Sequence, residues 1–80
     1  MTYKIVEVEW FDAQTSTTSM FIEDVRELKP LHSHSVGYLI DDNPKKDYII
    51  LSFLNFGDDL TKHHQVIPRG MIKKIKVIRR

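Results

Sequence analysis

The stretch that decides the fold is residues 3–10, YKIVEVEW. Its side chains alternate between two faces, with Lys4, Val6, Val8 and Trp10 on one and Tyr3, Ile5, Glu7 and Glu9 on the other. Alternation over this length is typical of a β-strand with one buried side. It predicts a first strand that turns its Val and Trp residues toward a core.

Four more segments along the chain are predicted as strands: residues 34–41, 48–56, 62–67 and 72–78. In the first of them Val36, Tyr38 and Ile40 alternate with Ser35, Gly37 and Leu39. Turns rich in Asp, Asn, Gly and Pro (DDNPKKD, NFGDDLTK and IPRG) separate the four segments. Residues 48–56 are apolar on both faces, so one face needs a cover, either from the loop after the first strand or from another subunit.

The segment between the first two strands is the longest connection. FDAQTSTTS is polar and predicts a loop, and in IEDVRELKP the residues Ile22, Val25 and Leu28 are spaced by three before Pro30. One or two helical turns fit there. Five strands, short turns and one long excursion predict an all-β fold, a small five-stranded SH3-like barrel formed by residues 1–80 as a single domain.

The composition is that of an ordinary globular domain, with 29% charged and 41% hydrophobic residues. A chain of 80 residues buries only about 60% of the surface that its unfolded state exposes, so self-association would help its stability. No apolar run approaches the ~20 residues that span a bilayer, and acidic residues interrupt the N-terminal segment. We therefore expect a cytoplasmic protein without membrane contact. The absence of cysteine excludes disulfides and thiolate chemistry.

The net charge of +1 hides an asymmetry. Residues 69–80 contain six Lys and Arg and no acid, whereas residues 1–68 contain six Lys and Arg against 11 Asp and Glu, a balance of −5. This basic end can contact phosphates. Alternatively, its lysines only keep a solvated edge strand from pairing with other chains.

The histidines raise the question of a metal site. His32 and His34 are two residues apart and point to one side of an extended chain, and His63 and His64 could bring a further imidazole. Neighbours on a strand face opposite ways, so His63 and His64 cannot both join one compact site without a bulge. We expect solvent-facing histidines, no metal and no cofactor.

No catalytic group is predicted. Ser33 and Ser35 flank His34, but adjacent side chains on a strand diverge, which makes a poor nucleophile and base pair. The acid pairs at residues 41–42 and 58–59 lie in turn-like sequence, where water keeps carboxylates ordinary. The sequence predicts a protein that is not an enzyme.

Aromatic and basic residues provide the candidate ligand-binding set: Trp10, Phe11, Gly37, Tyr38, Arg69 and Lys73. Flat rings stack on bases, and an arginine fork binds a phosphate through two hydrogen bonds. A glycine within a strand indicates a bulge or a close approach by a ligand or by backbone. For Trp10 and Tyr38, a structural role in the core or at an interface is an equal alternative.

Three motifs carry a family resemblance. They are Trp10-Phe-Asp12-Ala13, Ser35-Val-Gly37-Tyr38-Leu39-Ile40-Asp41 and Ile67-Pro68-Arg69-Gly70-Met71-Ile72. Together they resemble a family of small phage and prophage proteins of about this length, across nearly the whole chain. The last motif also looks like the short 3₁₀ turn that precedes the last strand of SH3-like barrels.

Phage accessory proteins of this size include oligomeric inhibitors of host defence that sequester cyclic nucleotide signals. The resemblance therefore implies a non-enzymatic homo-oligomer that binds a small anionic ligand in the host cytoplasm. An Sm-like or SH3-like barrel that binds nucleic acid is one alternative, although a charge of +1 is low for such proteins. A protein-interaction module, docking through the two-faced strand at residues 48–56, is the other.

Overall fold

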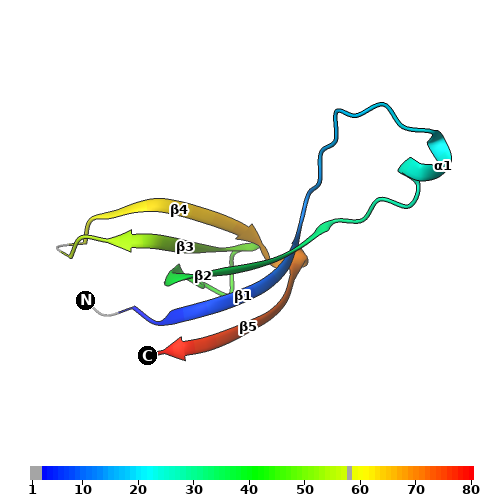
Figure 1. The fold of residues 1–80 in the computed structure, drawn as a ribbon. Coiled ribbons are helices and arrows are strands. Elements are labelled where there is room, and N and C mark those ends of the chain that lie inside the picture. The colour runs from blue at the N-terminus through cyan, green and yellow to red at the C-terminus, as the bar shows by residue number, and fades with distance from the viewer. Residues whose placement is uncertain (1–2, 58) are drawn as a thin grey trace.

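The computed structural model describes residues 3–57 and 59–80, and it is mainly β (Figure 1). Its five strands are β1 (Ile5–Asp12), β2 (Leu31–Asp41), β3 (Tyr48–Asn55), β4 (Thr61–Pro68) and β5 (Ile72–Arg79). All neighbouring strands are antiparallel and form one sheet in the order β4-β3-β2-β1-β5. The predicted all-β class with five strands is confirmed.

The path of the chain is that of the predicted SH3-like barrel. Strands β1 to β4 follow one another across the sheet, and β5 returns to pair with β1 at the far edge. The 3₁₀ turn η1 (Arg69–Met71) makes this return between β4 and β5, as the Ile-Pro-Arg-Gly-Met-Ile motif predicts. Figure 1 shows the sheet curling, so that β3 and β4 lie over β1 and β5.

The core lies between these two halves of the curled sheet. Val6, Val8 and Trp10 of β1 are buried, as their alternation predicts. They pack with three buried residues from β3 and β4, which are Ile49, Leu51 and Ile67. Each fully buried side chain of this size contributes about 1.5–3 kcal/mol relative to an exposed one.

The first two strands extend further into the connection between them than the sequence predicts, although β1 begins at Ile5 rather than at Tyr3 and so keeps its predicted length of 8 residues. β1 extends to Asp12, and β2 begins at Leu31 rather than at His34. Cross-strand pairs of Phe11 with His32 and of Asp12 with Leu31 continue the ladder through residues whose own pattern does not alternate. His32, which the sequence places before the strand, therefore lies within it together with His34.

The long connection between β1 and β2, residues 13–30, forms an arm that projects away from the sheet (Figure 1). The arm contains α1 (Ile22–Val25), which confirms the predicted helical turn. The arm's residues are all exposed, with Phe21 at 83%. Because the arm points away from the sheet and its residues are exposed, it does not cover β3, and the predicted cover from this loop is wrong.

The inward face of β2 carries Gly37 and Leu39, of which Gly37 is buried and Leu39 packs against the core. Tyr38 therefore lies on the outer face, opposite Ile5 of β1 and Ser52 of β3, and is half-buried. Its predicted alternative role as a core residue is wrong. In residues 3–57 and 59–80, neither helix has the length and apolarity that crossing a bilayer requires.

Candidate functional site

The structure separates the six predicted ligand-binding residues. Trp10 is 5% exposed, and its indole Nε1–H donates a hydrogen bond to Ser35 Oγ at 3.0 Å. Its ring is thus part of the core, which matches the structural alternative for this residue. Tyr38 stands apart from the remaining candidates on the outer face of β2.

A glycine is required at position 37 because the backbone of β3 approaches β2 closely there. A Cβ atom at this position would lie 2.8 Å from the carbonyl oxygen of Ser52 and 3.2 Å from Cδ1 of Phe53. Such distances are shorter than ordinary van der Waals contact. The glycine therefore lets β3 and the Phe53 ring lie against β2, and the predicted close approach is made by the protein's own chain.

Arg69 holds the turn between β2 and β3. Its Nε donates to the carbonyl oxygen of Lys46 at 2.7 Å, and its Nη2 donates to those of Asp42 and Asn43 at 3.0 and 2.9 Å. The backbone N–H of Arg69 also donates to the carbonyl oxygen of Asp47, at 2.7 Å. The guanidinium predicted to bind phosphate is engaged with backbone in this structure.

The same turn is closed by an ion pair between Lys46 Nζ and Asp41 Oδ2 at 2.5 Å. The hydrogen bond from Lys46, followed by one from the backbone N–H of Asn43, lowers the pKa of Asp41. The hydrogen bond to Asp41 in turn raises the pKa of Lys46. Arg69 and this ion pair are therefore parts of one structural device.

The remaining two predicted residues, Phe11 and Lys73, meet at a cluster on the outer face of β1, β2 and β5. We call it the histidine face, and its members are Glu9, Phe11, His32, His34 and Lys73. Glu9 pairs with His34 and Phe11 with His32 across the β1–β2 ladder. Paired residues share a face and alternate residues along a strand point the same way, so the four side chains stand together.

The side chains of the histidine face are in direct contact. His32 Nε2 lies 2.5 Å from Glu9 Oε2. The Phe11 ring stacks on His32, with centroids 5.1 Å apart and planes at 20°, and His34 is tilted against His32 at 5.0 Å. Lys73 Nζ lies 3.7 Å from Glu9 Oε2.

A bulge brings Lys73 to this position. On the β5 side of β1 the register shifts between Glu9, which pairs with Lys74, and Trp10, which pairs with Ile72. Lys73 is the extra residue between these two pairs. A bulge of this kind redirects a side chain, and here it places Lys73 beside the Glu9 carboxylate.

The electrostatics of the histidine face favour an ionised Glu9. The hydrogen bond with His32 is the largest cause and lowers the pKa of Glu9. Burial, the next largest, raises this pKa, and the charges of Lys73, His32 and His34 lower it further. The carboxylate is therefore charged at neutral pH. It is an acceptor for cations and for N–H donors.

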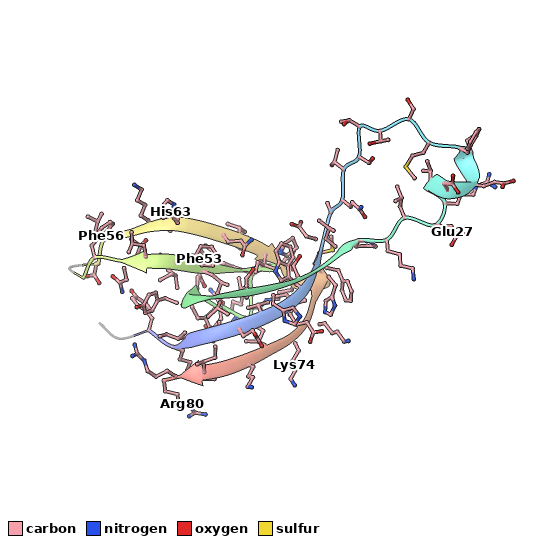
Figure 2. All side chains as sticks on the ribbon, in the orientation of Figure 1. Glu27, Phe53, Phe56, His63, Lys74 and Arg80 are labelled. Atoms are coloured by element: carbon pink, nitrogen blue, oxygen red, sulfur yellow. The ribbon has the colours of Figure 1, made fainter. Side chains whose placement is uncertain are left out.

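Glu9 is the member of the histidine face that the sequence did not reveal. It reads as one acid on the polar face of a strand, and only the register of β1 against β2 places it opposite His34. Conversely, His63 and His64 lie on β4, at the opposite edge of the sheet from Lys74 and β5 (Figure 2). Neither belongs to the group formed by Glu9, His32 and His34.

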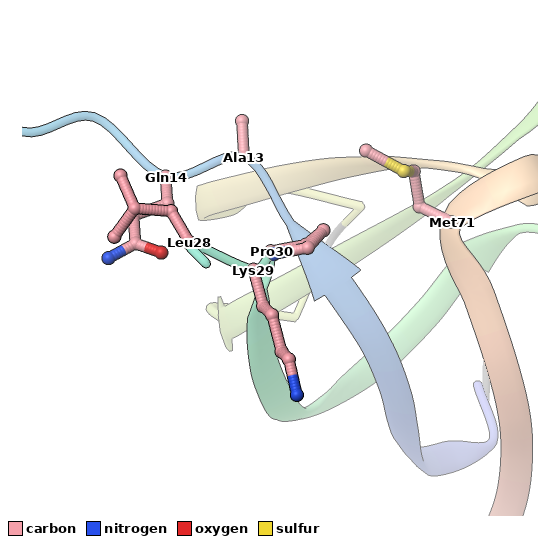
Figure 3. Close-up of a pocket in the computed structure, with 6 residues that line it drawn as sticks. All are labelled: Ala13, Gln14, Leu28, Lys29, Pro30 and Met71. Carbon is pink, nitrogen blue, oxygen red and sulfur yellow. The ribbon is translucent and has the colours of Figure 1, made fainter. Parts of the chain in front are cut away.

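A shallow hollow lies where the arm leaves the sheet (Figure 3). Ala13, Gln14, Leu28, Lys29, Pro30 and Met71 line it. Ala13 ends the first sequence motif, and Met71 lies in η1 within the third, so two of the three sequence motifs meet at this hollow. None of the six predicted ligand-binding residues lines it.

Comparison with known proteins adds no relative. No protein-family model, no curated protein and no solved structure matches the chain.

Proposed function

We propose that the protein is a non-enzymatic, cytoplasmic binder of a small anionic ligand with a flat ring, and that the histidine face receives this ligand. The observation that carries the proposal is the cluster of the Phe11, His32 and His34 rings beside Lys73, in which Phe11 stacks on His32. A nucleotide combines the same two features, because its base stacks on rings at about 1–3 kcal/mol and its phosphate attracts lysines.

The surroundings of these rings favour binding of an anion. Lys73, which belongs to the histidine face, begins a row of exposed cations along β5 that continues with Lys74, Lys76 and Arg79. The acids opposite this row are Glu7, which pairs with Lys76, and Glu9, which pairs with Lys74. Cations therefore outnumber acids along this part of the sheet.

The positions of the two serines next to the histidines in the sequence argue against catalysis. Ser35 Oγ accepts the Trp10 indole hydrogen bond, and Ser33 pairs with Trp10 in the β1–β2 register. Both serines therefore lie on the face of β2 opposite to His32 and His34. The alternation of the strand keeps a hydroxyl nucleophile away from an imidazole base, which supports a binding role.

The ligand class we favour is a cyclic nucleotide used as a host-defence signal, which the protein, as a phage-type accessory protein, would sequester. This part rests on the resemblance to small phage proteins. Assembly as a homo-oligomer is part of the same proposal, and the exposed apolar side chains of the arm, such as Phe21 and Ile22, support it.

A panel of cyclic mono- and dinucleotides tests the proposal by thermal unfolding and gel filtration. We expect one member to raise Tm, because a ligand at 100 times its Kd stabilises the folded state by about 2.7 kcal/mol. Phe11→Ala and Lys73→Gln should weaken the shift, whereas Lys62→Gln on the distant strand β4 should not. No shift at millimolar ligand and no retention after gel filtration would exclude this function.

A second candidate is nucleic-acid binding, which the row of exposed cations on β5 favours. A phosphate backbone would follow that row, and binding would fall steeply with added salt. Lys74→Gln and Lys76→Gln should then each weaken binding and reduce the salt dependence, while Phe11→Ala has less effect. Salt-independent binding of a mononucleotide would favour the first proposal instead.

A protein-interaction module is the third candidate, and the exposed apolar residues of the arm and of β3 favour it. Co-purification of the tagged protein from its host would reveal such a partner. A monomer that retains no other protein counts against this candidate.

A further inference from the structure

We propose that Glu9, His32 and His34 bind one divalent transition-metal ion of the zinc class on the outer face of β1 and β2. The sequence alone predicts no metal, because it does not show that Glu9 faces the two histidines. Metal binding at this place does not depend on the proposed nucleotide function, although both use the histidine face.

The geometry of the three side chains fits one ion. Their nearest ligand atoms all lie within 4.8 Å of one another. A tetrahedral ion with bonds of about 2.0–2.1 Å holds its ligand atoms about 3.3 Å apart. Binding therefore requires the three side chains to turn about their own torsions until their ligand atoms reach this spacing. The ion would replace the contact between His32 Nε2 and Glu9 Oε2, now 2.5 Å.

The chemistry of the ligands selects the class of metal. Two imidazoles and one carboxylate suit zinc, cobalt and nickel, whereas magnesium and calcium prefer sites made of oxygen alone. Two histidines with one glutamate form a known ligand set for zinc sites in which water or another small ligand takes the fourth position. The half-exposed His32 leaves such a position open to solvent.

The sheet holds the ligands in place before any ion arrives. β1 is paired on both sides, with β2 and with β5, so the positions of Glu9, His32 and His34 are fixed by hydrogen-bonded ladders. The stacked Phe11 ring further orients His32. Metal sites depend on such supporting contacts, because they reduce the entropy lost when the ligands converge.

Lys73 opposes the metal and provides a test that separates the two proposals. Its ammonium lies 3.7 Å from Glu9 Oε2, where it competes with a cation for the carboxylate. Replacing it with a neutral residue should therefore strengthen metal binding by about two- to threefold, the value of an exposed ion pair. The same change should weaken binding of an anionic nucleotide.

Titration of the full chain with Co²⁺, followed by its visible d–d absorption, is the experiment. We expect one equivalent to bind, with displacement by Zn²⁺ and none by Mg²⁺. Glu9→Gln and His34→Asn should each weaken binding at least about tenfold, a loss of about 1.4 kcal/mol. Lys73→Gln should tighten it.

The matched control is His63→Asn, which also removes one histidine. His63 lies on β4 with a φ of 61°, a conformation that asparagine tolerates, so this variant should fold and keep full Co²⁺ affinity. Glu9 and His34 lie on the outer face of the sheet, and circular dichroism should show that their variants remain folded. The proposal is overturned if the wild type gives no cobalt spectrum in excess metal, or if His63→Asn loses as much affinity as His34→Asn.

Discussion

The sheet and the arm both contain regularly spaced apolar residues, but those of the sheet are buried and those of the arm are exposed. In β1, every second side chain from Val6 to Trp10 is buried. In the arm, residues 13–30, the apolar residues Phe21 and Ile22 are 83% and 70% exposed. The alternation in β1 meets partner strands on both sides, whereas the threefold spacing in the arm produces a helical turn that has no surface to pack against.

This difference suggests that one region of the molecule provides stability and another provides surface for binding. A short helix forms few hydrogen bonds for the entropy that it costs, so α1 adds little to the free energy of folding. The stability of the domain is therefore concentrated in the core and in the contacts that close the sheet. The arm and the outer faces are available for partners, and substitutions should affect the two regions very differently.

Trp10→Ala should have the largest effect. It removes a buried aromatic side chain, for which we expect a loss of about 3–5 kcal/mol in the free energy of unfolding. Urea unfolding followed by circular dichroism measures it. Phe21→Ala in the arm is the matched control and should change stability by no more than about 0.5 kcal/mol. Equal losses from the two variants would contradict the division between sheet and arm.

Ser35→Ala tests the smaller, polar part of the same contact. It removes the acceptor of the Trp10 indole N–H and should cost about 1–3 kcal/mol, because a part-buried donor loses its partner. The same urea titration measures it. A loss as large as that of Trp10→Ala would mean that the hydrogen bond, rather than ring burial, dominates the contribution of Trp10.

Gly37→Ala should destabilise the sheet by about 1–3 kcal/mol, because the new Cβ would meet the Ser52 carbonyl at 2.8 Å. Gly70→Ala is its control. No atom lies within 4 Å of a Cβ at that position, so Gly70→Ala should be neutral or raise stability by up to about 1 kcal/mol. Thermal unfolding of the two variants gives the comparison. An unchanged Tm for Gly37→Ala would show that the backbone of β3 can move away from β2 at little cost in free energy.

Arg69→Lys should cost about 1–2 kcal/mol in urea unfolding. It keeps the charge but cannot reproduce a fork that reaches three carbonyl oxygens in the β2–β3 turn. Arg26→Lys, the same change in the exposed arm, should have no measurable effect. If Arg69→Lys leaves stability unchanged and instead abolishes ligand binding, Arg69 is a ligand residue, as the chemistry of its guanidinium predicts.

The sequence predicted the strands well because alternation is a local property. The buried face of β1 and the η1 turn both follow from residues close together in the chain. The histidine face did not, because it depends on how Glu9 aligns with His34 across residues 13–30, and the loop does not determine that register. The role of Arg69 was hidden for the same reason, since its carbonyl partners lie more than 20 residues away.

The smallest effect on stability should come from the arm itself. Replacing Phe21 and Ile22 together with serine removes its two most exposed apolar side chains, which contribute little to the core, so we expect the free energy of unfolding to change by at most about 0.5 kcal/mol. The mass of the protein in solution is the more informative measurement. If copies of the chain associate through the arm, the double variant should become smaller by gel filtration and light scattering at unchanged Tm, because these side chains then pack between molecules rather than within one. An unchanged mass would place any oligomer interface on another surface, and a large fall in Tm of a monomer would show that the arm packs on the sheet after all.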